Sequence, residues 1–540
     1  MIDRTALLAD LKPEVRSLED DLRERSASEV GFATVLKAEW QTARDAKRTA
    51  STYETWLDDR VTQAAVAWIL ATVFVRFCED NGLIDQPYLA GPGERLAVAI
   101  ERQQEFFQQH PEMTDRDWIV AGVEALAVSK VAAGMFDRAH NPMWTITPSH
   151  DAAKALLTFW RKRGEDAEIV HDFTDPDWGT RFLGDLYQDL SEHAKKMYAL
   201  LQTPEFVEEF ILDYTLEPAV DEFGLDGLRL IDPTCGSGHF LLGAFRRLLG
   251  KWETKAPAVD RWELVSRALG SVHGVDKNPF AAAIARFRLL VAAMKAAGVA
   301  SVVDAPNFPL NVAIGDSLLH GRGGPGIQTE LDLFGDHETH TYVTEDIHEY
   351  EKPPIDLLGV GTYHVVVGNP PYITVKDKQE NENYRNAYKS CSGKYALSVP
   401  FAERFFQLAI RGGQGERVAG YVGQITANSF MKREFGRNMI EEFFPTIDLT
   451  HVVDTSGAYI PGHGIPTAIL IGRRRWARPE STVRAVMGVR GEPSQPSEPA
   501  KGLVWSAIVE QIGRPGGDSE WITVADVSRE YLASHLDHKG

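Results

Sequence analysis

Residues 228–240 read LRLIDPTCGSGHF, and the chain continues as LLGAF through residue 245. The short apolar run at 228–231 predicts a buried strand, the glycine-rich stretch predicts a tight turn, and the residues from 239 onward predict a helix. A strand, a glycine turn and a helix in this order bring the backbone close to a nucleotide-like ligand. The stretch therefore predicts an α/β fold with a ligand site at the carboxyl end of its strands.

The chemistry of this turn favours a cationic ligand over a phosphate. Its spacing matches neither G-x-x-x-x-G-K-[ST] nor G-x-G-x-x-G. Asp232 lies at the mouth of the turn, where a carboxylate would repel a pyrophosphate and attract an ammonium group. Cys235 is expected to be a small packed thiol rather than a nucleophile, because no base accompanies it in the sequence.

Two further acids follow predicted strands. The strand at 271–276 ends in Asp276, about where a βαβ unit places the acid that binds ribose hydroxyls. A helix is expected at 279–297, and the next strand, at 310–314, leads to Asp316, which would suit an adenine amino group. One Asp at a strand end is usually a cap, but three on successive strand ends indicate a binding site.

Residues 365–372 read VVVGNPPY and predict a buried strand that stops abruptly. The two prolines hold the exit extended. The Asn369 side-chain carbonyl and the Pro370 backbone carbonyl are two acceptors that suit an exocyclic NH₂ group, and the Tyr372 ring offers a face for a planar base. The other interpretation is a structural turn with a surface tyrosine.

Composition narrows the class of protein. The 540 residues carry a formal charge of −20 and are 44% hydrophobic, which is typical of a soluble multidomain protein rather than one that coats nucleic acid. The three cysteines are isolated, so neither a disulfide framework nor a metal site is expected. The N-terminus lacks a signal-peptide core, and the apolar run at 64–77 is too short to span a membrane. We expect a cytoplasmic protein with no membrane partner.

Three regions are expected along the chain. Residues 1–200 form a helical domain, residues 201–478 form the α/β domain, and residues 479–540 form a linker and the start of a C-terminal region. Thr203 is a plausible N-cap with Pro204 at the first position of a helix from 205 to 214. Residues 321–362 interrupt the α/β pattern and are expected to be a long, partly mobile excursion.

The motif at 232–238 followed by the one at 369–372 resembles the S-adenosylmethionine-dependent adenine-N6 DNA methyltransferases in their gamma arrangement. The resemblance covers residues 201–478, and it implies a Rossmann-like methyltransferase sheet with helices on both faces. The segment FCEDNGL at 77–83 and residues 427–436 are similar to the PglX-type methyltransferases of phage-growth-limitation (BREX) defence systems.

The resemblance implies a role for each matching residue. S-adenosylmethionine would be the cofactor, Asn369 and Pro370 would hold N6 of an adenine flipped out of double-stranded DNA, and Tyr372 would stack on that base. Catalytic residues would be Asn369, Pro370, Pro371 and Tyr372. The cofactor site would comprise Thr203, Pro204, Asp232, Pro233, Cys235, Gly236, Ser237, Gly238, Phe240, Asp276, Lys277, Asp316, Ser317 and Asn369.

Two departures from the family pattern leave alternatives open. Ile460 occupies the place where relatives often present an aromatic residue, so its neighbour Tyr459 is a second candidate for stacking. After residue 475 no separate target-recognition domain follows, so DNA recognition is expected from missing sequence, a separate subunit or other defence proteins. Phosphate contacts or a solvated charged face are equally compatible with the basic residues Lys376, Lys378, Lys432, Arg433 and Arg437.

Three functions are compatible with these observations. The first is adenine-N6 methylation of DNA, as the modification component of an anti-phage defence system. The second is methylation of another NH₂ group, on cytosine N4 or a protein glutamine. The third is a cofactor-binding subunit of a defence complex that is inactive alone.

Overall fold

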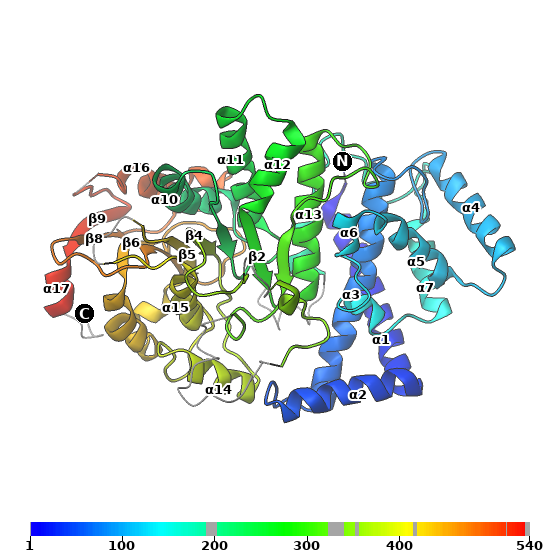
Figure 1. Cartoon of the computed structure of the whole chain (residues 1–540), viewed down its shortest axis with the longest axis horizontal. Coiled ribbons are helices and arrows are strands. Elements are labelled where there is room, and N and C mark those ends of the chain that lie inside the picture. Colours follow the sequence, from blue (N-terminus) through cyan, green and yellow to red (C-terminus); the bar gives the residue numbers. More distant parts are fainter. Residues whose placement is uncertain are drawn as a thin grey trace.

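The computed structural model describes residues 2–190, 202–321, 340–350, 356–413, 418–514 and 516–534. Its centre is a nine-stranded sheet in the order β3-β2-β1-β4-β5-β7-β6-β8-β9 (Figure 1). The strands are β1 (Leu230–Asp232), β2 (Val272–Asp276), β3 (Asn311–Ile314), β4 (Val365–Gly368), β5 (Tyr421–Ala427), β6 (Asp448–Asp454), β7 (Thr467–Arg473), β8 (Thr482–Gly488) and β9 (Ile522–Ser528).

The strand order reverses direction at β1. From β1 the chain first adds β2 and then β3 on one side, and later adds β4 and β5 on the other side. All pairs among these five strands are parallel, whereas β7 lies antiparallel between β5 and β6. In open α/β sheets the ligand crevice lies outside the carboxyl ends of the strands at such a switch point. The crevice is therefore expected between the ends of β1 and β4.

Helices cover both faces of the sheet. Val365 and Val367 of β4 join the apolar cluster formed with α10, α11 and α13, while Val366 joins the opposite cluster, which contains the aromatic residues of α15. Figure 1 shows α10 and α11 on one side of the strands and α14 and α15 on the other. The predicted fold class is confirmed. The helices are α10 (Glu205–Phe223), α11 (His239–Lys255), α12 (Arg261–Gly270), α13 (Pro279–Ala297), α14 (Lys378–Ala387) and α15 (Ser398–Leu408).

The first 190 residues are helical, as predicted. Asn81 caps the C-terminal end of α3, and Gly82, which follows it, adopts φ 67°. The side chain of Ser149 caps α7 by accepting from the Ala152 N–H. The helices are α1 (Arg4–Ser28), α2 (Val30–Asp45), α3 (Tyr53–Asp80), α4 (Arg95–Gln109), α5 (Asp115–Leu126), α6 (Lys130–Ala133), α7 (His150–Trp160) and α8 (Phe182–Asp189).

Helix α3 is longer than its apolar sequence run suggested. It extends over 28 residues, and among the described residues it is the one helix long and apolar enough to cross a membrane. The apolar run within it was expected to be too short for that, so the expectation about length was wrong. Its most apolar part is wholly buried inside the protein, where it forms the centre of the N-terminal helices.

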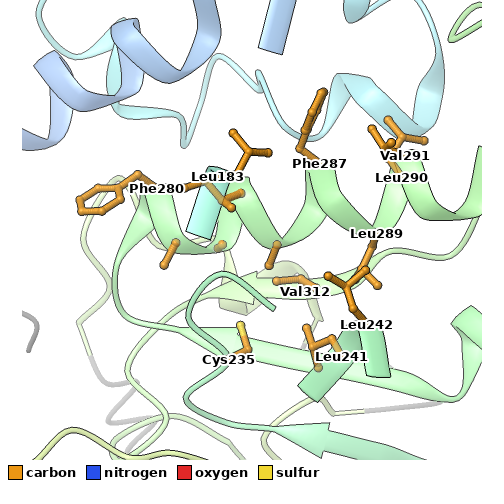
Figure 2. Close-up of a cluster of buried hydrophobic side chains, with 14 of the residues drawn as sticks. Leu183, Cys235, Leu241, Leu242, Phe280, Phe287, Leu289, Leu290, Val291 and Val312 are labelled. Carbon is orange, nitrogen blue, oxygen red and sulfur yellow. The ribbon is translucent and has the colours of Figure 1, made fainter. Parts of the chain in front are cut away.

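The N-terminal helices and the sheet share one hydrophobic core. The ring of Phe287 on α13 stacks on Phe74 of α3 with centroids 4.2 Å apart, and it meets Phe77 edge to face at 5.6 Å. Figure 2 shows α13 between the N-terminal elements and the sheet, with Phe287 and Val291 directed to the former and Leu289 to the latter. Helix α13 therefore fixes α3 relative to the strand ends.

Two boundaries differ from the sequence expectation. Helix α10 begins at Glu205 with Pro204 in the extended cap position, so Thr203 is not its N-cap, and the helix runs to Phe223 rather than 214. Pro218 lies within it, where its missing N–H removes one helical hydrogen bond without ending the helix. Gly224, with φ 78°, ends it.

The sheet continues past residue 478. Strand β8 pairs parallel with β6, β9 pairs antiparallel with β8, and α16 (Leu503–Gln511) lies between them in the chain. The division into three domains stays a prediction. Of the excursion predicted at 321–362, residues 322–339 and 351–355 lie outside the described part of the chain.

Candidate active site

A cavity of about 800 Å³ opens at the carboxyl ends of β1, β2 and β4. That volume lies within the range of cavities that hold cofactor-sized ligands. The structure brings most of the predicted site residues together in its wall, whereas Pro204, Gly238 and Tyr459 do not line it. The predicted residues that do are Thr203, Asp232, Pro233, Cys235, Gly236, Ser237, Phe240, Asp276, Lys277, Asp316, Ser317, Asn369, Pro370, Pro371 and Tyr372.

The glycine turn ties β1 to β2. Gly236 and Gly238 adopt φ 51° and 82°, which favour glycine, and the Gly236 N–H donates to Asp276 Oδ2 at 2.8 Å. A Cβ at Gly238 would lie 3.1 Å from the Cβ of Ala285, so this glycine allows α11 to approach α13 rather than lining the cavity. Burial raises the pKa of Asp276 to about 6, although the N–H groups of Asn278 and Gly236 oppose the shift.

Asp232 is a buried carboxylate whose charge is not balanced by a cation. Its side chain is 2% exposed, and Oδ1 accepts from the N–H and the hydroxyl of Thr234 at 2.9 and 3.1 Å. Burial raises the pKa of Asp232 to about 8. Among the ion pairs of the described residues, none involves Asp232, while its carboxylate faces the cavity. A cationic group of a ligand would therefore find a favourable partner here.

Asp232 lies directly against the NPPY stretch. A Cβ built on Gly368 would lie 2.4 Å from Asp232 Oδ1 and 2.9 Å from Thr234 Oγ1, closer than real atoms approach. Strand pairing explains this contact, because β1 and β4 are neighbours and their ends lie side by side. A ligand group held by Asp232 and a second ligand held by Asn369 would thus be adjacent.

The NPPY side chains contact one another. The Tyr372 hydroxyl donates to Asn369 Oδ1 at 2.6 Å, and burial raises the pKa of Tyr372 well above its ordinary value. The ring in contact with Tyr372 is His463, with centroids 5.9 Å apart and planes at 54°. Ile460 is buried in the core. His463 was missed although it lies in the same loop as Tyr459 and Ile460, because the sequence does not show which residue of this loop meets Tyr372.

Asp316 is held by a network of charged groups. Oδ2 accepts from the Tyr384 hydroxyl at 2.6 Å and lies 3.4 Å from Lys277 Nζ and 3.6 Å from Arg48 Nη2. Burial alone would raise the pKa of Asp316, but Lys277, Arg48 and the Tyr384 hydroxyl outweigh it and hold that pKa below its ordinary value. Asp316 is thus an ionised acceptor in the cavity wall.

The N-terminal region supplies one wall of the cavity, which the sequence did not indicate. Asp377, five residues after Tyr372, accepts hydrogen bonds from the Thr49 hydroxyl, from the Ala50 N–H at 3.0 Å, and from the Ser51 N–H and hydroxyl at 3.1 and 2.9 Å. The lining residues from this region are Thr49, Ala50, Ser51, Thr52, Thr55, Trp56, Asp59 and Arg60.

The basic residues noted in the sequence are divided between two places. Lys376 and Lys378 lie at the cavity. The other three, Lys432, Arg433 and Arg437, are exposed and do not line it, and Arg437 Nε pairs with Glu441 Oε2 at 2.9 Å.

Among the described residues, one group of possible metal ligands lies outside the cavity. Ligand atoms of His140, His348 and Glu349 come within 4.8 Å of one another, and the latter two side chains are exposed. The expectation that the chain has no metal site stays a prediction.

Comparison with known proteins supports the resemblance. Residues 270–460 match the family model described as Eco57I restriction-modification methylase. Adenine-specific methyltransferase PglX of Streptomyces coelicolor is 54% identical over 98% of this chain and 45% of its own length. Type II methyltransferase M.PaeR7I of Pseudomonas aeruginosa is 25% identical over 49% of this chain and 39% of its own length.

A third relative, type II methyltransferase M.BstVI of Geobacillus stearothermophilus, is 22% identical over 64% of this chain and 55% of its own length. The chain thus spans about half the length, or less, of these three relatives. Residues 270–460 are thus similar to the Eco57I restriction-modification methylases, and nearly all of the chain is similar to part of the adenine-specific methyltransferase PglX.

Proposed function

We propose that this chain transfers a methyl group from S-adenosylmethionine to N6 of adenine in DNA, as the modification component of an anti-phage defence system. The observation that carries the proposal is the contact between Asp232 and Gly368. It makes the acid suited to the cofactor's ammonium group a direct neighbour of the residues suited to an amino group of a base. Methyltransferase families use S-adenosylmethionine in general, and the three relatives are named as methyltransferases.

The donor set fits S-adenosylmethionine. The uncompensated carboxylate of Asp232 suits its ammonium group, and the Asp276 carboxylate, supported by the Gly236 N–H, suits the ribose hydroxyls. The ionised carboxylate of Asp316 suits the amino group of its adenine ring. When bound, this cofactor supplies an electrophilic methyl group. Cys235, buried with its pKa raised by burial, serves packing in this scheme.

The NPPY residues fit the amino group that receives the methyl. The Asn369 carbonyl oxygen has two lone pairs, so it can accept from N6–H while the Tyr372 hydroxyl uses the other. A second acceptor, the Pro370 carbonyl, would take the other hydrogen. Two accepted hydrogen bonds favour a tetrahedral nitrogen whose lone pair is free for in-line attack, and the Tyr372 ring would support the flipped base.

Double-stranded DNA is the proposed partner, with Lys376 and Lys378 near its phosphates at the cavity rim. We assign a part in target recognition to a separate subunit or to other defence proteins, and we place the reaction in the cytoplasm. A flipped base stacked on the Tyr372 ring would contact the His463 ring, and not Tyr459, as its second aromatic neighbour.

Calorimetric titration with S-adenosylmethionine, followed by transfer of labelled methyl to DNA, tests the proposal. Wild type should bind at micromolar concentration, Asp276→Ala should not, and the exposed Asp304→Ala should match wild type. Asn369→Ala should still bind cofactor yet transfer methyl far more slowly than wild type, and mass spectrometry of the wild-type product should show N6-methyladenine. Transfer to a protein fraction or to cytosine would contradict the substrate. Binding without any transfer would support an inactive subunit, and no binding would reject the cofactor.

A further inference from the structure

Arg48 connects the N-terminal helices to the cofactor end of the cavity. It lies in the loop between α2 and α3, and its side chain is 3% exposed. Its Nη2 atom lies 2.8 Å from Glu345 Oε1 and 3.6 Å from Asp316 Oδ2. Asp316 lines the cavity and Arg48 does not. Arg48 can therefore act on a ligand in the cavity through Asp316.

The charges around Asp316 depend on Arg48. Three acids, Asp316, Glu345 and Glu380, lie in one network of ion pairs with two cations, Arg48 and Lys277. The first two acids and Arg48 are buried, whereas Glu380 and Lys277 are partly exposed. Lys277 is shared between Asp316 and Glu380. Without Arg48, Glu345 would keep two partners at Oε2, the Tyr342 N–H at 2.8 Å and His320 Nε2 at 3.7 Å. Asp316 would lose one of its two cations. A buried carboxylate that loses its partner tends to move or to take up a proton.

Asp316 can accept a further hydrogen bond from a donor in the cavity. Its Oδ1 atom accepts from the Leu318 N–H at 3.0 Å, and Oδ2 accepts from the Tyr384 hydroxyl at 2.6 Å. A carboxylate offers about four lone-pair sites, so an N–H group of a ligand can be accepted as well. An amino group on a purine would be favoured, whereas a carbonyl oxygen in the same place would face a negative charge.

The loop that carries Arg48 is fixed to the site itself. Asp377, five residues after the NPPY stretch, accepts the hydrogen bonds from Thr49, Ala50 and Ser51 described above. The Arg48 guanidinium also lies over the Tyr342 ring, 5.5 Å from its centroid. Arg48 is therefore held on two sides and cannot follow a displaced Asp316 without breaking these contacts.

Resting on the proposed function, we propose that Arg48 is a positioning residue for cofactor recognition. It keeps the Asp316 carboxylate ionised and directed into the cavity, so that the site selects a purine with a 6-amino group. The N-terminal helical region is then part of the cofactor site and not only a neighbour of it.

The test compares binding of S-adenosylhomocysteine and S-inosylhomocysteine by calorimetry on the full chain. Their purines differ in the 6-amino or 6-oxo group and in the proton that the oxo form carries on N1. Wild type should prefer the adenosyl compound by roughly 10- to 150-fold, the range expected for one hydrogen bond to a charged group. Arg48→Met should reduce this preference to about threefold or less, and Asp316→Asn should abolish or reverse it, because an amide can also donate.

Three controls separate this role from a structural one. Lys47→Met removes an exposed charge next to Arg48 and should keep the full preference. Arg48→Lys, which keeps the charge, should recover part of it. Should Arg48→Met fail to fold, the double variant Arg48→Met, Glu345→Gln is used instead. It removes one charge of each sign, so it should fold while still lacking the preference for the adenosyl compound. Wild-type preference in either Arg48→Met protein overturns the inference, whereas no binding by wild type rejects the proposed cofactor itself.

Discussion

The hydroxyl group of Tyr372 donates a 2.6 Å hydrogen bond to the side-chain oxygen of Asn369. The two ends of the NPPY stretch are thereby linked, and the acceptor proposed for the amino group of the base already holds one donor. The bond fixes the orientation of the carboxamide, with its oxygen and not its NH₂ group toward the hydroxyl.

Asn369→Ala should lower kcat for DNA methylation by roughly 10²- to 10³-fold, the range measured when one preorganised transition-state hydrogen bond is removed. Cofactor affinity should change far less. Tyr372→Phe keeps the ring and leaves the Asn369 oxygen free, so its kcat should stay within a few fold of wild type. Steady-state transfer of labelled methyl to DNA measures both, and a wild-type rate for Asn369→Ala would contradict the proposed role.

Gly368→Ala should disrupt the cofactor turn. The added Cβ would overlap Asp232 Oδ1 and would lie 2.9 Å from Phe405 Cζ, so the side chains of Asp232 and Phe405 must shift. The expected loss of stability is about 1–3 kcal/mol, together with weakened cofactor binding. Gly250→Ala is the matched control, because Gly250 lies exposed in α11 with open space around it and should gain about 0.5–1 kcal/mol. Urea unfolding measures both. Equal stability of the two variants would show that the contact with Asp232 is not tight.

Asp232→Asn should stabilise the ligand-free protein in a pH-dependent way. Burial raises the pKa of Asp232 from 3.8 to about 8, so the folded state keeps a proton that the unfolded state releases, and wild-type stability falls as pH rises between these values. The gain in stability of Asp232→Asn over wild type should grow from pH 4 to pH 8 and stay constant above pH 8.

The same Asp232→Asn variant should bind S-adenosylmethionine more weakly, because the ammonium group loses an anionic partner. Thermal unfolding of both proteins across this pH range measures the first effect and calorimetry the second. A stability difference that does not vary with pH would show that Asp232 is not a buried titrating group.

Arg76→Met should be strongly destabilising. Arg76 is fully buried and pairs with Glu79 at 3.0 Å and with Asp80 at 2.6 Å. Its removal leaves two buried acids without a cation, which should lower the free energy of unfolding by about 3–5 kcal/mol. The exposed pair of Arg138 with Glu124 provides the comparison, since Arg138→Met should change the free energy of unfolding by about 1 kcal/mol or less. Denaturant titration measures the free energy of unfolding of both variants. Similar losses in the two would mean that the buried network contributes little to stability.

Much of the fold could be predicted because its signals are local. Helix α13 begins at Pro279 and ends at Ala297 as its sequence pattern predicted, since Asn278 caps one end and Gly298 ends the other. The glycine turn and the NPPY stretch likewise mark the ends of the strands that precede them, because the residues that end each strand lie within a few positions of it. Strand β8 could not be recognised, because its pairing partners, β6 and β9, are set by tertiary structure rather than by its own sequence.

The candidate site could be predicted in part for the same reason. The acids at the strand ends could be predicted because each directly follows a strand that the local sequence pattern indicates. Arg48 and Asp316 lie 268 residues apart in the chain and meet only because α13 fixes α3 against the sheet. No local pattern predicts such a contact. His463 was missed for the same reason, since its loop meets the NPPY stretch only in the folded protein.

The hydrogen bonds from residues 49–51 to Asp377 also bear on how this protein can change in evolution. A recombination event that exchanged the first 200 residues between relatives would replace one wall of the cavity and leave the other wall as it was. Chimeras with a mismatched pair of walls would lose the pocket although each half kept its own fold. The inherited unit is therefore the combination of residues 48–60 and 369–384, and these two segments should change together.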